Sequence, residues 1–500
     1  MTISLIIFII YLVVLVAIGI VTYMRTKSYS NYTIAGRTNN MWVTALSAEA
    51  SDMSGWLLLG LPGMAYVFGY SAIWLVIGLI AGTLFDWVAV ANRLRKATEF
   101  YNAITLMEFF DKRLGDKKGT VSLIACIVIV VFMIVNSSAE IIGSGKLLNA
   151  AFGFDYNVGI YIGVAIVLVY TFLGGFMAVS WSNLIQGTIM FFAIILVPIV
   201  GIAQMGGWGD FKFQVAALDP NMFNFLGGET GFLPILGLVL GGVGIALYYP
   251  GAPHIVTNFM AIKNPKEIKA STLIAMVWVG LSIYGAVLIG MYGRVMFPDI
   301  ADPEQVFLPL VEMLFPSAMM GVFASAVMAA ILSSVSAYLI VAAASFASSI
   351  YRKLAKVEDD RKLVPVQRIS IVVLCLIALL MSFSGGLVFE IALFACAGFG
   401  ACFAPLLLAS LYSKKINRKG AIVSMIVGMI VCIVWYYSGL SNYIYEIIPA
   451  TAISAFLLFA VSKATGGPDE KDTAFFESFL QTLRLKKKTE IKQEIKEETK

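Results

Sequence analysis

The stretch of sequence that decides the fold is Ala48-Glu49-Ala50-Ser51-Asp52-Met53-Ser54-Gly55-Trp56, which places carboxylates inside an otherwise apolar run. A charged side chain inside a bilayer costs several kcal/mol unless a cation, a polar cavity or a partner compensates it. The Ser54-Gly55 pair directly after Asp52 weakens the helix at the acid. Backbone carbonyls released beside a buried acid can bind a small hard cation such as sodium. The stretch therefore predicts a membrane protein that moves an ion together with a second solute.

The composition indicates that the chain is dissolved in a lipid bilayer. Of its 500 residues, 60% are hydrophobic and 13% are charged, whereas soluble proteins carry about 25% charged residues. Apolar runs of about 20 residues, the length that crosses a hydrocarbon core, recur along nearly the whole sequence. We therefore predict an all-α integral membrane protein.

Thirteen transmembrane helices are predicted, and the first is a retained helix and not a removed signal peptide, because no small-residue cleavage site follows it. The predicted spans are 3–23, 41–61, 66–90, 120–145, 158–178, 183–205, 232–253, 271–296, 318–349, 367–386, 388–412, 420–438 and 445–463.

The basic residues predict the orientation. Arginines and lysines concentrate in alternate connections, whereas the intervening connections hold only Lys146, Lys212 and Arg294. Basic loops face the cytoplasm, so we expect a multi-pass cell-membrane protein with its N-terminus outside and its C-terminus in the cytoplasm. The net charge of +5 then reflects this topology, and we expect no nucleic-acid partner.

A second interrupted span supports an internal repeat. Residues 241–255 contain Pro250 and Pro253, which remove helix hydrogen bonds. The two irregular spans are the second and the seventh, so each would begin a five-helix unit, and the second unit would enter the membrane from the opposite side. Interrupted helices at equivalent positions of inverted repeats mark a substrate site near the midplane. The expected parts are 1–40 (extra helix and loop), 41–231 and 232–412 (inverted repeats), 413–465 (two peripheral helices) and 466–500 (cytoplasmic tail).

The ninth span offers oxygen ligands for the ion. Ala330, Ser333 and Ser334 share one helix face, so two hydroxyls and a carbonyl can converge with carbonyls near Ala50 and Met53. The alternative interpretation is that these serines bond back to carbonyls of their own helix.

Three motifs carry a resemblance to the sodium:solute symporter family, and most of all to its sodium/proline symporter branch. They are the Ser47–Leu57 run, the Tyr170–Trp181 run and Pro253-His254, and the resemblance covers residues 5–465. It implies thirteen helices with a leucine-transporter-type core of two inverted five-helix repeats and one sodium site. Carried over, that site comprises the carbonyls of Ala50 and Met53 together with Ala330, Ser333 and Ser334. Asp52 adjoins it and helps to admit sodium.

The expected substrate region departs from the proline carriers that the chain resembles. Asn136 and Ile245 stand where the resemblance implies a tyrosine and a tryptophan, whereas Tyr249 is retained; Glu49 and Glu140 are additional acids. Glu140 either pairs with Lys146 near the outer surface or belongs to the substrate site. The candidate substrate-binding residues are Ser54, Gly55, Asn136, Glu140, Ile245 and Tyr249.

The predicted function is sodium-coupled import of a small amino acid, proline first, without an organic cofactor. The alternative is a sodium symporter for a cationic or other polar amino acid, or another organic solute, that uses Glu49 and Glu140. The remote alternatives are an ion channel and a membrane sensor. A channel would need a continuous polar pore, whereas the sequence offers isolated acids and two interrupted helices. A sensor would need a recognisable soluble domain, whereas the tail covers only residues 466–500. An enzyme would need a nucleophile–base pair or a metal set, and His254 is the only histidine.

Overall fold

The computed structural model describes residues 2–25 and 28–498 and is helical almost throughout. Within these residues, eleven helices are long and apolar enough to cross a membrane, and a shorter apolar helix covers Tyr156–Phe172. This confirms the all-α class and the multi-pass prediction. The only β-bridge in the described part joins Asn39 to Ile262.

Most of the helices match the predicted spans to within a few residues. Their bounds are α1 Thr2–Arg25, α3 Met41–Asp52, α4 Leu61–Phe68, α5 Ile73–Phe85, α6 Asn92–Phe100, α7 Leu106–Arg113, α8 Thr120–Phe152, α9 Tyr156–Gln204, α10 Trp208–Leu218, α11 Phe232–Gly244, α12 Pro253–Ala261, α13 Ile268–Met296, α14 Phe307–Leu314, α15 Ser317–Phe346, α16 Arg352–Leu354, α17 Leu363–Ser382, α18 Val388–Tyr412, α19 Arg418–Tyr437, α20 Ile447–Ala464 and α21 Glu470–Glu498.

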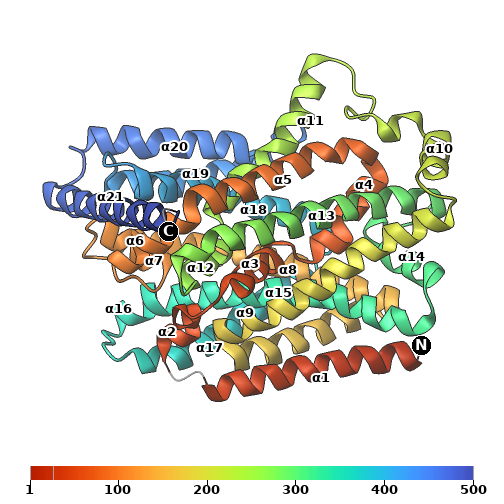
Figure 1. Cartoon of the computed structure of the whole chain (residues 1–500), viewed down its shortest axis with the longest axis horizontal. Coiled ribbons are helices and arrows are strands. Elements are labelled where there is room, and N and C mark those ends of the chain that lie inside the picture. The colour runs from red at the N-terminus through yellow and green to blue at the C-terminus, as the bar shows by residue number, and fades with distance from the viewer. Residues whose placement is uncertain (1, 26–27, 499–500) are drawn as a thin grey trace.

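Helix α15 forms the centre of the bundle. It is buried along the length that would cross the membrane and packs against α1, α3, α8, α9 and α17. Its sequence is rich in alanine and serine, and such small side chains let neighbouring helix backbones approach closely in a membrane protein. The expected ion ligands on this helix therefore lie in the middle of the fold (Figure 1).

The loops segregate to the two ends of the bundle. Figure 1 places the N-terminus, α10 and α14 at one end and α6, α7, α16 and α21 at the other. The second end carries the basic connections after α7, α16 and α18.

The structure places a kink between two predicted spans and shifts the start of a third. The predicted spans 158–178 and 183–205 correspond to the two parts of α9, Tyr156–Phe172 and Gly175–Gln204, which meet at a kink at Gly175, whose φ of 60° and ψ of −175° are not helical. Glycine is required there because an added Cβ would lie 2.6 Å from the Tyr32 ring. The predicted span 66–90 instead begins after a turn at Gly69 and continues through a π-helical segment, Asp86–Ala91, into α6.

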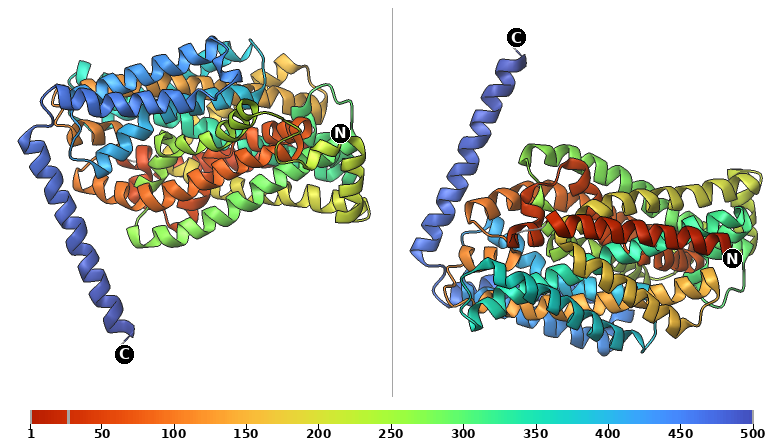
Figure 2. Two further views of the ribbon diagram at one scale, coloured as in Figure 1. Left: turned by 90° about the horizontal axis from the view of Figure 1, so that it is seen from above. Right: turned by 90° about the horizontal axis from the view of Figure 1, so that it is seen from below.

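The start of the C-terminal helix α21 docks on the bundle, and its remainder extends away from it (Figure 2). Phe476 and Phe479 are buried. The Arg113 guanidinium lies 3.7 Å from the centre of the Phe476 ring, and Phe475 and Phe479 pack against Phe100 and Tyr101 with tilted or edge-to-face rings. Arg113 also donates to the Ser410 and Ser413 carbonyls at the end of α18.

Candidate functional site

The first helix break lies where the sequence predicted it. Helix α3 ends at Asp52, Met53 leaves the helical region with φ −77° and ψ 70°, and the chain resumes as a π-helical segment at Trp56. The Met53 amide still donates to the Glu49 carbonyl at 2.7 Å. The backbone is therefore irregular for only a few residues, directly beside the carboxylate.

The second break contacts the first. Helix α11 ends at Gly244, short 3-10 turns follow, and α12 begins at Pro253. Within this break the Tyr248 hydroxyl donates to Asp52 Oδ1 at 2.9 Å and lies 3.0 Å from His254 Nε2. Two interrupted helices far apart in the sequence thus meet at one carboxylate.

The expected sodium ligands come together between α3 and α15. The Ser333 hydroxyl donates to the Ala50 carbonyl at 2.6 Å and to the Ala330 carbonyl at 2.8 Å. The Ser334 hydroxyl lies 3.4 Å from the same Ala50 carbonyl. Met53 follows in the break, one turn after Ala50. Ser333 thus bonds to a carbonyl of its own helix and also contacts α3, so both interpretations of these serines hold. The neutral oxygens that converge here suit a hard monovalent cation.

Three buried carboxylates surround the first break. Asp52 is 3% exposed, and its Oδ2 has no hydrogen-bond partner among the described residues. Glu49 Oε1 accepts from Trp87 Nε1 at 2.8 Å. Asp86, which the sequence analysis missed, is also buried, and both of its carboxylate oxygens are unpartnered in the described part. An acid inside a predicted span was the signal that could have found it.

The expected substrate residues divide into two groups. Glu140 Oε2 accepts from the Gly55 amide at 2.9 Å, and the polar atoms Ser54 Oγ and Asn136 Oδ1 are buried without a partner in the described region. Ile245 instead lines a cavity of about 20 Å³, which is room for about one water molecule. The other lining residues are Asp52, Trp56, Leu75, Leu79, Tyr248, Phe389, Ala392, Leu393 and Cys396.

Tyr248, the neighbour of the expected substrate residue Tyr249, lines this cavity and hydrogen-bonds to Asp52. The Tyr249 hydroxyl has no hydrogen-bond partner among the described residues, and the Tyr249 ring packs closely against Gly82 of α5. The cavity is too small to hold an amino acid.

The proposed pairing of Glu140 with Lys146 is wrong. Lys146 Nζ lies 2.6 Å from Glu304 Oε2 and 2.9 Å from Asp302 Oδ2. Glu304 also accepts from the amides of Val388 and Phe389, each at 3.0 Å. Lys146 therefore pairs with the two acids of the loop before α14, and it is not the ion-pair partner of Glu140.

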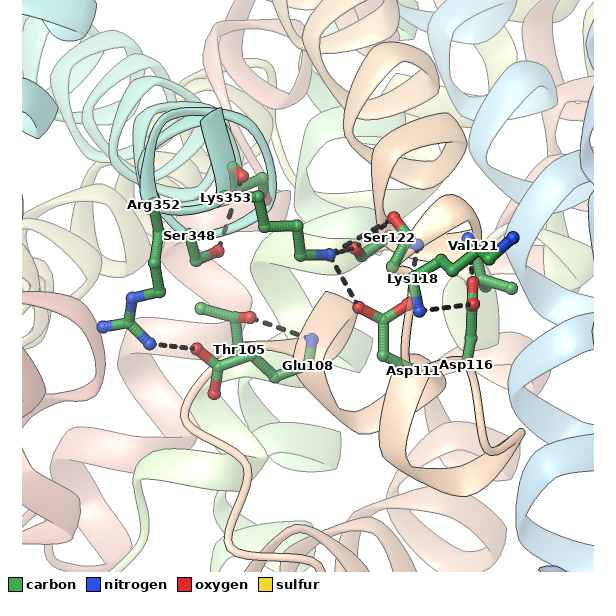
Figure 3. Close-up of polar contacts among 12 residues, drawn as sticks. Thr105, Glu108, Asp111, Asp116, Lys118, Val121, Ser122, Ser348, Arg352 and Lys353 are labelled. Atoms are coloured by element: carbon green, nitrogen blue, oxygen red, sulfur yellow. Dashed lines mark hydrogen bonds and ion pairs between the residues drawn. The ribbon is translucent and has the colours of Figure 1, made fainter. Parts of the chain in front are cut away.

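The far end of α15 is anchored by an ionic network at the basic end of the bundle (Figure 3). Lys353 lies 2.9 Å from Asp111 Oδ2 and donates to the Ser122 hydroxyl at 2.5 Å. Arg352 lies 3.5 Å from Glu108. The element that carries Ser333 and Ser334 is thus tied through its continuation to α7 and the start of α8.

Interrupted helices that meet beside a buried acid, in an otherwise continuous helical bundle, define a secondary transporter. Two solved structures share this fold. A Na⁺-coupled sialic acid symporter in a substrate-bound outward-open state superposes with a TM-score of 0.80 at 18% identity, over 94% of this chain and 99% of that one. Mhp1, a nucleobase-cation-symport-1 family transporter, does so with a TM-score of 0.55 at 15% identity, over 91% and 99%.

The chain belongs to the sodium:solute symporter family, whose model matches residues 32–428. It is 40% identical to the high-affinity proline transporter PutP of Bacillus subtilis, over 93% of this chain and 99% of the relative. It is 37% identical to a sodium/proline symporter of Staphylococcus aureus, over 95% and 94%. This family and fold are those of transporters and not of enzymes, and the resemblance seen in the sequence is confirmed.

Proposed function

We propose that this protein is a sodium-coupled symporter that imports a small amino acid, with proline as the first candidate. The observation that carries the proposal is the convergence of Ala50, Ala330, Ser333 and Ser334 beside Asp52, where two broken helices meet. Relatives named as proline carriers over nearly their whole length support the choice of substrate.

Sodium would act by tying α3 to α15. Ions and solute are coupled when both favour the same conformer of the carrier. A tenfold inward sodium gradient supplies about 1.4 kcal/mol, and a membrane potential of about 100 mV adds about 2.3 kcal/mol per charge. One sodium ion could therefore concentrate a neutral solute about several hundred-fold.

Uptake into proteoliposomes tests this function. The purified chain is reconstituted, and uptake of labelled proline, alanine, ornithine and arginine is measured with an inward sodium gradient and with an equal potassium gradient. We expect saturable, sodium-dependent uptake of at least one of these amino acids. Uptake that is equal in the two gradients would refute sodium coupling.

A cationic amino acid is the second candidate, because the buried acids have no basic partner. Glu49, Asp52, Asp86 and Glu140 are all buried, and none forms an ion pair within the described part of the chain. Buried acids in a membrane protein favour a positively charged partner. In the uptake panel, competition by ornithine or arginine without competition by proline would select this candidate.

We also propose the finer topology. Thirteen crossings of the bilayer result when the Tyr156–Phe172 helix is added to the eleven long helices and the Trp56–Phe100 helix is divided after Phe68, so that its first part crosses together with α3. The contact between Asp52 and Tyr248 supports two inverted repeats over 41–231 and 232–412 whose first helices are broken. The basic loops at one end of the bundle support a cytoplasmic C-terminus and an external N-terminus (Figure 1).

Thiol labelling in whole cells checks this orientation. Cysteines introduced at the exposed positions Asp210, in α10, and Glu229, in the connection from α10 to α11, should react with an impermeant reagent added outside, because α10 lies at the end opposite the basic connections. Cysteines at Lys117, Lys356 and Lys415 should react only after the cells are permeabilised. The five native cysteines are buried, so the parent chain serves as the background control. The reverse pattern would overturn the orientation.

A further inference from the structure

The Gly55 amide at the first break donates to a side chain of the protein itself. Gly55 directly precedes the second half of the broken helix, which runs from Trp56 to Phe68. Its amide donates to Glu140 Oε2 at 2.9 Å. The neighbouring amides of Met53, Ser54 and Leu57 donate instead to nearby backbone carbonyls, at 2.7, 2.9 and 3.0 Å. The Gly55 donor is thus directed out of the helix, towards α8.

Such an amide is where a carrier of this fold can hold an anion. The N-terminal ends of half-helices carry a partial positive charge, and in transporters with broken helices they point at anionic groups of the substrate. In this chain a carboxylate already lies there, and it belongs to Glu140. A substrate carboxylate that approached the Gly55 amide would meet a second negative charge.

Glu140 is built into this position. Its side chain is fully buried, and an added Cβ at Gly55 would lie 2.7 Å from Glu140 Oε2. Lys146, one and a half turns along α8, is engaged by Asp302 and Glu304 and does not neutralise it.

Three further polar atoms of Glu140, Ser54 and Asp52 lack partners in the described part of the chain. Glu140 Oε1, Ser54 Oγ and Asp52 Oδ2 are buried and have no hydrogen-bond partner among the described residues. A purely structural glutamate would leave one acceptor unpaired and, when it is ionised, a charge uncompensated in the bundle, which is costly in a membrane. A ligand with N–H donors and a positive charge would satisfy both.

We propose that Glu140 takes the place of a substrate carboxylate at the break. The site then binds the amine end of the substrate, and a carboxylate on the substrate is not needed for binding. Glu140 is thereby a specificity-determining residue that selects organic ammonium compounds. This inference rests on the proposed sodium-coupled uptake and narrows its substrate class, for proline and for cationic amino acids alike.

Competition between matched analogues tests the inference. Pyrrolidine keeps the amine of proline without the carboxylate, whereas N-acetylproline keeps the carboxylate without a basic amine. Against uptake of labelled proline, pyrrolidine should compete within about threefold of unlabelled proline, and N-acetylproline should be at least about a hundredfold weaker. If ornithine is the transported label, putrescine and Nα,Nδ-diacetylornithine replace the two analogues.

Variants of Glu140 test whether its side chain causes the expected competition by pyrrolidine and N-acetylproline. Glu140→Gln keeps the shape of the side chain but removes its charge. It should lower the affinity of pyrrolidine as a competitor by more than about tenfold, or about 1.4 kcal/mol. Glu140→Gly frees the Gly55 amide, so that a competitor should now need a carboxylate to bind there. The affinity of pyrrolidine, relative to that of proline, should therefore fall by at least about tenfold. Ser144→Ala is the control, because the Ser144 hydroxyl donates to the Ile141 carbonyl of its own helix.

The outcomes separate this inference from the proposed function. The inference is wrong, while sodium-coupled uptake stands, if N-acetylproline competes and pyrrolidine does not. It is also wrong if the affinity of pyrrolidine relative to proline is the same in Glu140→Gln as in the parent. If no amino acid of the panel is taken up, the proposed function fails. Thermal unfolding of the purified full chain in sodium then tests binding alone. A rise in melting temperature with pyrrolidine that Glu140→Gln abolishes would support the inference, and no rise would overturn it.

Discussion

Replacing Asp52 by asparagine is expected to raise the sodium concentration for half-maximal uptake by more than about tenfold, or about 1.4 kcal/mol. Asparagine keeps the shape and can still accept the hydrogen bond from Tyr248, but the negative charge beside Ala50 is lost. That negative charge attracts sodium towards the carbonyl and hydroxyl ligands, which carry no net charge themselves. Ser334→Ala should act in the same direction through a missing ligand. Initial uptake rates in proteoliposomes over a series of sodium concentrations measure both effects.

The matched control is Tyr248→Phe. It removes the hydrogen bond from Tyr248 to Asp52 Oδ1 without changing the charge. We expect sodium activation to change by less than about threefold in this variant, although substrate affinity can fall because Tyr248 lines the cavity. An Asp52→Asn variant with the sodium dependence of the parent would refute the assigned role of the carboxylate.

Replacing Gly55 by alanine should abolish transport or reduce it by at least about a hundredfold, or about 2.7 kcal/mol. The backbone of Gly55 has φ −52° and ψ −29°, so alanine fits its conformation and the effect must come from space. The new Cβ would lie 2.7 Å from Glu140 Oε2 and 3.1 Å from Ile331 Cγ1. The carboxylate would be pushed away from the break, and the amide would lose its acceptor. Initial uptake rates, corrected for the amount of protein in the membrane, measure the loss.

A second-site change distinguishes this mechanism from general misfolding. Combining Gly55→Ala with Glu140→Gly removes the side chain that the new methyl meets, and we expect uptake of a carboxylate-bearing substrate to recover in part. Gly143→Ala is the control on α8, because its added Cβ would find only ordinary contacts of 3.5 Å or more. A Gly55→Ala variant with full activity would show that Glu140 does not need its position at the break.

The two helix breaks could be predicted from the sequence because their signals are local. An acid followed by Ser54-Gly55 and a pair of prolines at 250 and 253 are visible without knowledge of the fold, and both mark breaks in the structure. The convergence of Ser333 on Ala50 was also predicted, because Ala330, Ser333 and Ser334 share a helix face and the resemblance pairs that face with the first break.

The residues that were missed lie where helical periodicity fails. Tyr248 and Tyr249 are adjacent in a break made of short 3-10 turns, so no 3.6-residue repeat says which ring faces Asp52. Asp86 begins a π-helical segment, and such a segment shifts the side-chain phase of the turns after it.

The partner of Lys146 could not be predicted for a different reason. Glu304 lies 158 positions further along the chain, in a loop before α14. Glu140, only six residues from Lys146, was the nearer candidate in the sequence. On a helix, however, a separation of six residues places two side chains on different faces, which disfavours this pairing.

The docked start of α21 has a practical meaning for anyone who expresses the protein. A chain shortened before Glu470 would lack Phe476 and Phe479, uncover the rings of Phe100 and Tyr101, and leave Arg113 without the aromatic face above it. Exposed aromatic surface of this kind promotes aggregation. An affinity tag is therefore better fused beyond the helix, which extends away from the bundle (Figure 2), than substituted for any part of it.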